Sequence, residues 1–221
     1  MKRILVFGDS NSWGYTDEDN GQRYEKRWPV LLNQELIQKG FNTEIIEDCL
    51  PGRTTNIDDP QDGIHLNGAK VLKSSLLSHS PIDLVILMLG TNDLKFRFQR
   101  TTENIADGIK ELIQIVLDTN SGSGGWHDVN KSNLVVICPP TLGQKSDDPN
   151  WINFKEWEGG LEKSTELHFS FEKVCSQMGV HLIDANEFCQ SSSIDPIHWS
   201  KKMHLKFSEN LANIIDQKIK L

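Results

Sequence analysis

The sequence predicts an α/β protein of three layers, in which helices cover both faces of a parallel sheet. Short apolar segments alternate with longer segments whose apolar residues recur at helical spacing along almost the whole chain. The apolar segments contain few polar residues, which is typical of parallel strands that are buried on both faces. Several of them end in small and polar residues, as strands do where they lead into functional loops.

Five segments have the length and composition of strands. The strongest is 82–89, an almost unbroken apolar stretch that must be covered on both faces. The predicted strands are residues 2–7, 43–47, 82–89, 134–138 and 180–183. Because right-handed crossovers leave few topologies, we expect the flavodoxin-like strand order 2-1-3-4-5 and not the dinucleotide-binding order.

Helices are predicted between and after these strands. Pro29 suits the first turn of one helix, which Gly40 closes. The segment 102–118 places its aliphatic residues on one stripe, with a threonine available as cap. Further helices are predicted near 66–77, near 167–178 and after Ser200.

The strand and helix alternation continues to the end of the chain, so we expect a single domain over residues 1–221. The glycines and serines of 120–125 indicate a surface loop near 119–131 and not a domain boundary. Residues 139–160 contain Trp151 and Trp157 but show no clear period. We predict that they form a long loop bordering the functional site.

The charge of the chain argues against two classes of partner. The formal net charge is -8, and the lysine and arginine residues are scattered. Binding to nucleic acids or to anionic membranes needs a clustered basic face. We therefore expect no nucleic-acid partner and no membrane partner.

The N-terminal segment does not have the pattern of a signal peptide. The apolar run after Lys2 and Arg3 is short and leads into Gly-Asp-Ser instead of a small-residue cleavage site. No apolar run reaches the roughly 18 residues that suggest a membrane span. The cysteines are far apart and are interpreted as buried free thiols, not as disulfides or metal ligands; they are Cys49, Cys138, Cys175 and Cys189. These features predict a cytosolic protein.

Residues suited to acyl transfer follow four of the predicted strands. They are Ser10, Gly52, Asn92, and Asp195 with His198. The carboxyl ends of parallel strands share one edge of the sheet, so loops that are far apart in the sequence can converge there.

Ser10 is predicted to be a nucleophile. Serine is weak in this role until a base removes its proton. His198 can be that base if Asp195 holds its other ring nitrogen and stabilises the imidazolium. Pro196 is expected to stiffen the short loop between them. His204, on the final helix, is expected to be structural.

An oxyanion formed during acyl transfer needs hydrogen-bond donors that are fixed in advance. The candidates are the backbone N–H groups of Ser10 and Gly52 and the side-chain amide of Asn92. Glycine lets the backbone approach closely, and asparagine supplies an uncharged donor. We interpret Asp9 and Asp93 as loop scaffolds and not as acids.

Four ordered motifs resemble those of the SGNH (GDSL-type) serine hydrolases. They are Gly8-Asp9-Ser10-Asn11, Gly52, Gly90-Thr91-Asn92-Asp93 and Asp195-Pro196-Ile197-His198. Because these motifs are spread along the sequence, the resemblance covers nearly the whole chain. The resemblance implies a triad of Ser10, Asp195 and His198 and an oxyanion hole of Ser10, Gly52 and Asn92. It also implies the flavodoxin-like sandwich of the SGNH hydrolase fold, without metal or cofactor.

Within this family the sequence looks closest to the arylesterase and acyltransferase branch. The stretches that carry this likeness include Ser12-Trp13-Gly14, Arg27-Trp28-Pro29, Gly52-Arg53-Thr54-Thr55-Asn56, Asp58-Asp59-Pro60 and Ser78-His79-Ser80-Pro81. That branch implies short-chain esters of small alcohols or phenols as substrates, acyl transfer to alcohols as a further activity, and homo-oligomers.

Two departures from the family pattern bear on the acyl pocket. Asn11 stands where leucine is usual. Around His198, Pro196 stands where glycine is common and Trp199 where leucine is common. Asn11 and Trp13 are candidate substrate-binding residues, and Arg53 is either a pocket residue or a loop anchor. As a group, the tryptophans near the site are interpreted first as packing residues; they are Trp13, Trp151, Trp157 and Trp199.

Two other functions stay open at this point. A carbohydrate O-acetyl esterase would use the same triad, and the sequence does not identify the alcohol. From a different class, the Ser-containing loop after the first strand could hold a flavin phosphate on a flavodoxin-like sheet. The sequence favours an α/β-hydrolase less, because its nucleophile elbow G-x-S-x-G needs glycine at Ser12.

Overall fold

The five predicted strands form one parallel sheet. The computed structural model describes residues 1–219 and 221. Its strands are β1 (Lys2–Gly8), β2 (Thr43–Cys49), β3 (Leu84–Met88), β4 (Asn133–Cys138) and β5 (His181–Asp184). They pair in the order β2-β1-β3-β4-β5, and every pairing is parallel. This confirms the predicted order 2-1-3-4-5.

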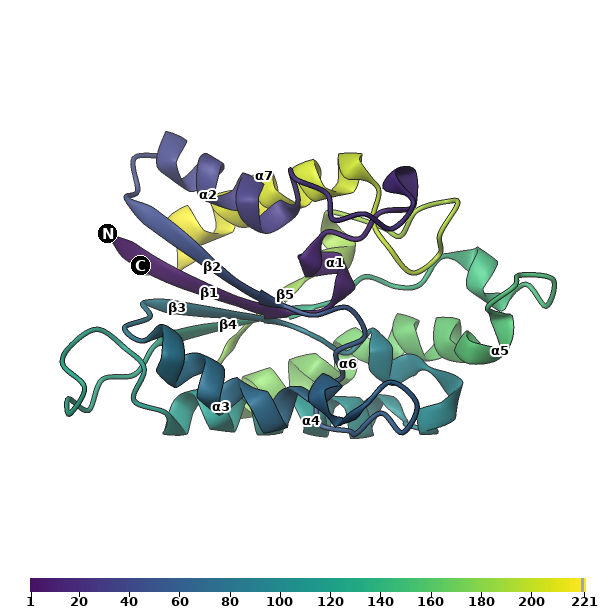
Figure 1. Ribbon diagram of the computed structural model, residues 1–221, viewed down its shortest axis with the longest axis horizontal. Coiled ribbons are helices and arrows are strands. Elements are labelled where there is room, and N and C mark those ends of the chain that lie inside the picture. Colours follow the sequence, from purple (N-terminus) through teal and green to yellow (C-terminus); the bar gives the residue numbers. More distant parts are fainter. Residues whose placement is uncertain (220) are drawn as a thin grey trace.

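Helices cover both faces of the sheet (Figure 1). One face carries α2 (Trp28–Gln38) and α7 (Lys201–Lys218), and the other carries α3 (Gly68–His79), α4 (Thr102–Asp118) and α6 (Gly160–Met178). Both chain ends lie at one end of the sheet, whereas α1 (Ser10–Trp13) and α5 (Phe154–Trp157) lie toward the other. The predicted three-layer sandwich is therefore confirmed. Among the described residues, no helix is both long enough and apolar enough to cross a lipid bilayer.

The longer helices begin at local sequence signals. At α4, Thr101 and Asn104 form a reciprocal capping box in which each side chain accepts the backbone N–H of the other. Ser200 accepts the N–H of Met203 and so caps α7, as the sequence predicts. Pro29 lies in the first turn of α2, where its missing N–H is tolerated.

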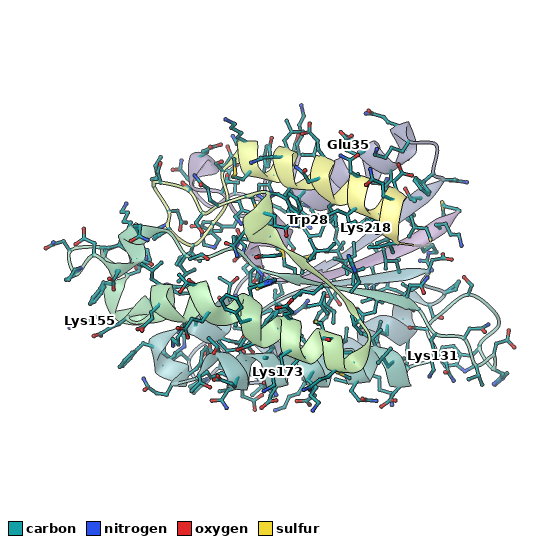
Figure 2. All side chains as sticks on the ribbon, turned by 180° about the vertical axis from the view of Figure 1, so that it is seen from behind. Trp28, Glu35, Lys131, Lys155, Lys173 and Lys218 are labelled. Carbon is teal, nitrogen blue, oxygen red and sulfur yellow. The ribbon has the colours of Figure 1, made fainter. Side chains whose placement is uncertain are left out.

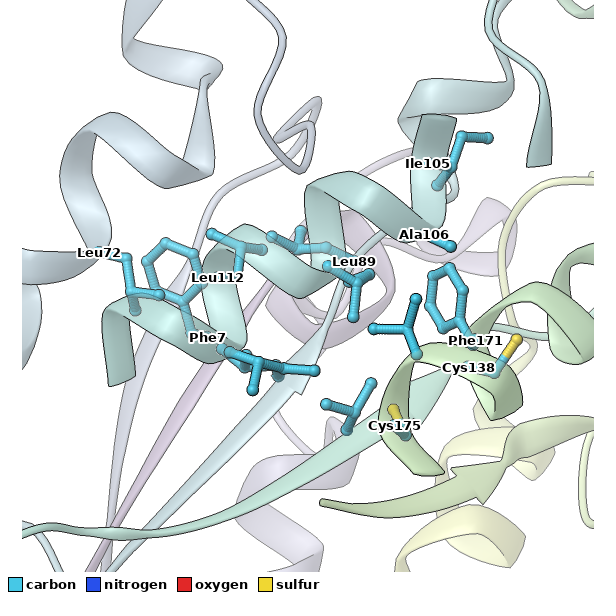
Figure 3. Packing of buried hydrophobic residues seen from close by; sticks show 14 of the residues in the cluster. Phe7, Leu72, Leu89, Ile105, Ala106, Leu112, Cys138, Phe171 and Cys175 are labelled. Atoms are coloured by element: carbon cyan, nitrogen blue, oxygen red, sulfur yellow. The ribbon is translucent and has the colours of Figure 1, made fainter. Parts of the chain in front are cut away.

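A separate apolar core lies on each face of the sheet. Under α2 and α7, the fully buried Trp28 packs edge-on against Phe207, with ring centroids 5.2 Å apart. Figure 2 shows Trp28 inside the molecule beneath α7, while the labelled lysines lie at its periphery. On the other face, Phe7 of the sheet, Leu112 of α4 and Phe171 of α6 belong to one cluster (Figure 3). Every residue of β3 is buried, which explains its unbroken apolar sequence.

The cysteines are free thiols, as predicted. Cys138, Cys175 and Cys189 are buried, and Cys49 is partly buried. Figure 3 shows Cys138 and Cys175 among apolar side chains. Burial raises the pKa of the Cys175 thiol to about 12, so this group stays protonated at neutral pH.

The segment 139–160 is more ordered than the predicted loop. It contains a 3₁₀ turn, η5 (Gln144–Asp147), and the single helical turn α5. Elements this short cannot show a helical period, which is why the sequence does not reveal them. Figure 1 shows α5 toward the same end of the sheet as α1, whereas the loop near 119–131 lies at the other end.

Candidate active site

The carboxyl ends of three strands bring the loops of the site together. In the sheet register, Gly8 of β1 lies beside Cys49 of β2 and Met88 of β3. The three strands therefore end at one level, and the loops that follow them begin side by side. These loops carry Ser10, Gly52 and Asn92.

A hydrogen-bonded relay joins Ser10, His198 and Asp195. Ser10 Oγ lies 3.0 Å from His198 Nε2, and His198 Nδ1 lies 2.6 Å from Asp195 Oδ2. One ring nitrogen thus faces a hydroxyl and the other faces a carboxylate. In this arrangement the imidazole can accept the serine proton through Nε2 while Nδ1 keeps its own. The structure brings together the three residues of the predicted triad.

Asp195 is held in its ionised form. Its Oδ1 accepts the backbone N–H of Ile197 at 2.9 Å and that of His198 at 3.3 Å. Burial alone would raise the pKa of Asp195, but the hydrogen bond and charge of His198, together with these backbone donors, hold it below its usual value. An ionised carboxylate at this place fixes the Nδ1–H tautomer of His198 and stabilises the imidazolium.

Three N–H groups beside the relay have the character of oxyanion donors. Ser10 is the first residue of α1, where backbone N–H groups have no acceptor within the helix. Gly52 adopts φ 87°, a left-handed conformation that favours glycine. Asn92 donates one N–H of its amide to the carbonyl of Arg53 at 3.1 Å, so the second N–H is available to another acceptor. Ser10, Gly52 and Asn92 all line the same cavity.

Arg53 anchors the loop that contains Gly52. Its guanidinium donates to the carbonyls of Gly8 and Asp48 and, at 2.8 Å, to the carboxylate of Asp48. It also lies over the ring of Phe7, 4.0 Å from the centroid. These contacts tie the loop after β2 to the ends of β1 and β2. Of the two roles considered for Arg53, the structure supports the loop anchor.

The two acidic residues of the motifs hold loops of the site, Asp93 by joining two of them and Asp9 by capping α1. Asp93 accepts the backbone N–H of Thr55 at 2.9 Å, and both the Thr55 hydroxyl and Arg100 at 2.6 Å. Asp9 accepts the backbone N–H of Asn11 at 3.0 Å. Both carboxyl groups are buried, and burial raises the pKa of Asp9 to about 6. Neither lines the cavity, in agreement with the scaffold role expected of them.

A cavity of about 410 Å³ contains the relay. Its lining includes a catalytic set, which consists of Ser10, Gly52, Asn92, Asp195 and His198. A second group, here called the loop set, comes from loops and short helices: Tyr15, Lys95, Trp151, Asn153, Glu156 and Trp157. The cavity is therefore bordered by the segment 139–160, as the sequence predicts.

Asn11, Trp13 and Arg53, the candidate substrate-binding residues, do not line this cavity. Asn11 is 1% exposed, and its side chain bonds to backbone on either side of His198. Trp13 instead carries the guanidinium of Arg23 over its ring. Because α1 is a helical turn, the residues that follow Ser10 point in other directions than its hydroxyl.

The residues of the loop set are the part of the site that sequence analysis missed. The ring of Tyr15 packs against that of His198, with centroids 4.1 Å apart. Trp151 and Trp157, interpreted as packing residues, line the cavity, whereas Trp199 is fully buried as expected. No motif or period marks these positions. The available signal was a long segment rich in tryptophan just before α6.

Charged side chains connect the loop set to neighbouring loops. Lys95 Nζ lies 3.2 Å from Glu156 Oε1, and the same oxygen accepts a hydrogen bond from Arg97 at 2.9 Å. Arg97 also donates to Asp59 at 2.5 Å. Lys95 Nζ is 5.6 Å from the centroid of the Trp157 ring. This network holds α5 against the loops that follow β2 and β3.

His204 has the structural role expected from the sequence. It is fully buried, and its Nδ1 accepts the backbone N–H of Trp28 at 3.2 Å. Burial lowers the pKa of His204 to about 3, so its ring is neutral at physiological pH. It packs edge-on against Trp199, the residue after His198.

One group of side chains outside the cavity has donors suited to a metal ion. A ligand atom from each of Cys138, His168 and Asp184 lies within 4.8 Å of the other two. None of the three lines the cavity of the relay. That the reaction needs no metal stays a prediction.

Comparison with known proteins identifies the family. Residues 6–206 match the GDSL-like Lipase/Acylhydrolase family. An arylesterase of Vibrio mimicus is 29% identical over 147 residues, which amount to 66% of this chain and 60% of that relative. The aligned part of this relative is therefore less than two thirds of its length.

Two solved structures are similar to this chain over nearly their whole length. The aryl esterase of M. smegmatis is 38% identical, with a TM-score of 0.87, and the match covers 98% of this chain and 99% of that one. A carbohydrate acetylesterase from Sinorhizobium meliloti is 35% identical, with a TM-score of 0.87 and the same coverage, 98% and 99%. These matches confirm the resemblance inferred from the motifs and support a carboxylic ester hydrolase. The chain belongs to the GDSL-like lipase/acylhydrolase family.

Proposed function

We propose that this protein is a serine esterase that hydrolyses short-chain carboxylic esters through an acyl-enzyme on Ser10. The observation that carries the proposal is the relay in which His198 lies 3.0 Å from the Ser10 hydroxyl and 2.6 Å from the Asp195 carboxylate. Family membership supports the reaction class.

In the acylation step, Ser10 Oγ attacks the ester carbonyl carbon while His198 Nε2 takes the hydroxyl proton. The charge that forms on the imidazole is stabilised by Asp195. The carbonyl oxygen becomes an oxyanion, which the backbone N–H groups of Ser10 and Gly52 and the amide of Asn92 can bind. The tetrahedral intermediate then collapses, His198 gives the proton to the leaving alcohol, and the acyl group stays on Ser10.

In the deacylation step, His198 removes a proton from water, and the water oxygen attacks the acyl carbonyl. The bond to Ser10 Oγ then breaks, His198 returns the proton to this oxygen, and the acid is released. An alcohol in the place of water would give a new ester. Acyl transfer to alcohols therefore needs no additional catalytic group, only a cavity that admits the alcohol.

The cavity favours a small substrate. Its volume of about 410 Å³ lies at the low end of small-molecule sites, which span about 300–1,000 Å³. The aromatic rings of Tyr15, Trp151 and Trp157 border it and offer apolar faces to an aryl leaving group. The likeness to the aryl esterase of M. smegmatis points the same way.

Labelling with a fluorophosphonate, located by peptide mass spectrometry, tests the nucleophile and the reaction class together. We expect the label on Ser10. Ser10→Ala should lose the label and lower the turnover of p-nitrophenyl acetate by about 10⁴-fold or more, with the thermal unfolding temperature nearly unchanged. Wild-type turnover in Ser10→Ala, or a label elsewhere in the chain, would refute the proposal.

A carbohydrate O-acetyl esterase is the second candidate. Lys95, Asn153 and Glu156 bring charged and amide groups into the same cavity, and such groups can bind sugar hydroxyls while tryptophan faces pack against the ring. The similar carbohydrate acetylesterase from Sinorhizobium meliloti agrees with this reading. Measuring kcat/KM for phenyl acetate and for acetylated monosaccharides separates the two candidates. A higher value for the sugars would replace the arylesterase proposal.

Four predictions about the protein stay predictions. They are acyl transfer to alcohols as a further activity, a homo-oligomeric state, a cytosolic location, and a single hydrolase domain over residues 1–221. Because the family is one of acylhydrolases, we propose the esterase and not the flavin-binding role.

A further inference from the structure

Asn11 is the residue after the proposed nucleophile, and its side chain contacts the loop of the proposed base. Its Nδ2 donates to the carbonyl of Ile197 at 3.2 Å, and its Oδ1 accepts the backbone N–H of Trp199 at 3.1 Å. Ile197 and Trp199 are the two neighbours of His198 in the chain. One amide therefore holds the backbone on both sides of the histidine.

We infer that Asn11 is a positioning residue, which sets the distance between His198 Nε2 and Ser10 Oγ without touching the substrate. This inference rests on the proposed serine esterase function. Asn11 is joined covalently to Ser10 and by two hydrogen bonds to the backbone around His198. Asn11 thus connects the nucleophile to the loop of the base, although Ser10 and His198 are 188 positions apart in the chain.

Asn11 is itself held rigidly. Its backbone N–H donates to Asp9 Oδ1 at 3.0 Å, and its side chain is 1% exposed. Buried hydrogen bonds do not compete with water, so they keep a preferred geometry. Further bonds hold the other side of the loop, where Ser192 N–H donates to the His198 carbonyl at 2.8 Å and Gly143 N–H to the Pro196 carbonyl at 2.7 Å.

The contact needs a donor and an acceptor on one planar group. The amide of Asn11 supplies both at any pH, with its N–H toward Ile197 and its oxygen toward Trp199. Leucine, the usual residue of the family at this position, offers neither. The two departures from the family pattern noted in the sequence, Asn11 and Trp199, thus meet at this hydrogen bond.

Two variants test the inference. Asn11→Leu removes both hydrogen bonds and leaves the carbonyl of Ile197 and the N–H of Trp199 unpaired. We expect kcat for p-nitrophenyl acetate to fall about 10- to 100-fold because a small misplacement of the base is enough for such a loss. KM should stay within about 2-fold, and the rate of fluorophosphonate labelling of Ser10 should fall with kcat.

Asn11→Asp keeps the acceptor for Trp199 but, when ionised, has no proton to donate to Ile197. Its kcat should lie between those of wild type and Asn11→Leu. A protonated carboxyl regains the donor, so the ratio of its kcat to that of wild type should rise as the pH is lowered. A residue with a merely structural role would not produce this pH dependence.

Ser121→Ala is the control for lost buried polar contacts. Ser121 is fully buried and bonds to Ser132 at 2.8 Å, in the loop that precedes β4 and away from the cavity. It should lower the unfolding temperature and leave kcat and the labelling rate unchanged.

The outcomes separate this inference from the proposed function. A wild-type protein that is not labelled on Ser10 would refute the proposed function and the inference with it. A labelled wild type with an unchanged kcat in Asn11→Leu would refute only the positioning role. A rise in KM alone would make Asn11 a substrate-binding residue, and loss of folding in both variants would make its role structural; either result overturns the inference.

Discussion

The two groups of residues that line the cavity are built in different ways. Ser10, Gly52 and Asn92 of the catalytic set stand in the loops that directly follow β1, β2 and β3, and buried polar contacts of Arg53 and Asp93 hold these loops from behind. The loop set stands on short turns and is held by ion pairs, such as that between Lys95 and Glu156. A sheet edge fixes atoms more tightly than turns do, because each strand is bonded to its neighbours along its length.

The carboxyl groups behind the two sets differ as well. Burial raises the pKa of Asp9, behind the catalytic set, to about 6. Asp59, behind the loop set, also loses hydration, but hydrogen bonds from Arg97 and from nearby backbone hold its pKa below the usual value. The catalytic set is thus backed by buried carboxyl groups, of which Asp9 has a raised pKa, whereas the loop set is backed by partly exposed ion pairs such as Arg97 with Glu156.

The largest effect within the catalytic set, apart from loss of the nucleophile, is expected for Asp195→Asn. Because Oδ1 accepts two backbone N–H groups, the oxygen of the new amide will stay there and its NH₂ will face His198 Nδ1. The ring must then carry its proton on Nε2, where it cannot accept one from Ser10. We expect a fall in kcat of about 10⁴-fold, measured with p-nitrophenyl acetate.

The matched control for this variant is Asp184→Asn. Asp184 also lies beside a histidine, with Oδ2 3.3 Å from His168 Nδ1, but outside the cavity. Its turnover should be that of wild type. An Asp195→Asn enzyme of normal activity would show that Asp195 does not orient the base.

Asn92→Ala should have the next largest effect. It removes a donor that is fixed by its bond to the Arg53 carbonyl, and donors of this kind contribute about 10²- to 10³-fold to the rate. The loss should fall on kcat, since the oxyanion exists only in the reaction. If steady-state kinetics showed a change in KM alone, Asn92 would bind the substrate, like the loop set, and would not stabilise the oxyanion.

Lys95→Met tests the loop set with a smaller expected change. The variant keeps the length of the side chain and removes the charge that faces Glu156 and the cavity. We expect KM for an acetylated monosaccharide to rise about 5-fold, with kcat and the kinetics on phenyl acetate nearly unchanged. Lys155→Met is the control, because Lys155 is an exposed residue of α5, the short helix that carries Glu156 (Figure 2). A loss of kcat like that of Asn92→Ala would abolish the distinction between the two sets.

Asp9→Asn should change stability and leave the rates almost untouched. A carboxyl whose pKa rises from 3.8 unfolded to about 6 folded stabilises the fold fully below about pH 4, and this contribution is lost as the pH rises through about 6. The amide of the variant does not titrate, so its contribution to stability does not change with pH. Relative to wild type, the variant should therefore gain about 2 kcal/mol in the free energy of unfolding between pH 4 and pH 7.

Urea unfolding of both proteins at several pH values measures this difference. Other carboxyl groups titrate in both proteins and cancel in the comparison. A difference between the two proteins that stayed constant with pH would mean that the pKa of Asp9 is not raised by folding.

The order of the sheet was predictable because it follows from local patterns. The apolar run of β3 requires cover on both faces, and the alternation of strands with helices leaves few topologies. The catalytic set was predictable for a related reason. Ser10, Gly52 and Asn92 are each the chemically distinctive residue at a strand end, and strand ends converge in any parallel sheet.

The loop set and the role of Asn11 could not be predicted in this way. Tyr15 meets His198 because the chain turns at Gly14, and Trp157 enters the cavity because α5 is held by Glu156 and its cations. Neither contact leaves a period or a motif in the sequence. Asn11 was visible as an unusual residue, but its side-chain direction depends on a one-turn helix.

The sheet, its order and the residues suited to acyl transfer follow from the amino-acid sequence, since they depend on hydrophobic patterning and on the chemical types after strand ends. Which side chains line the cavity, and which one contacts the backbone around His198, depends on the folded structure. Those contacts join loops that pack by their particular shapes and charges, and such packing has no counterpart in the linear order of the chain.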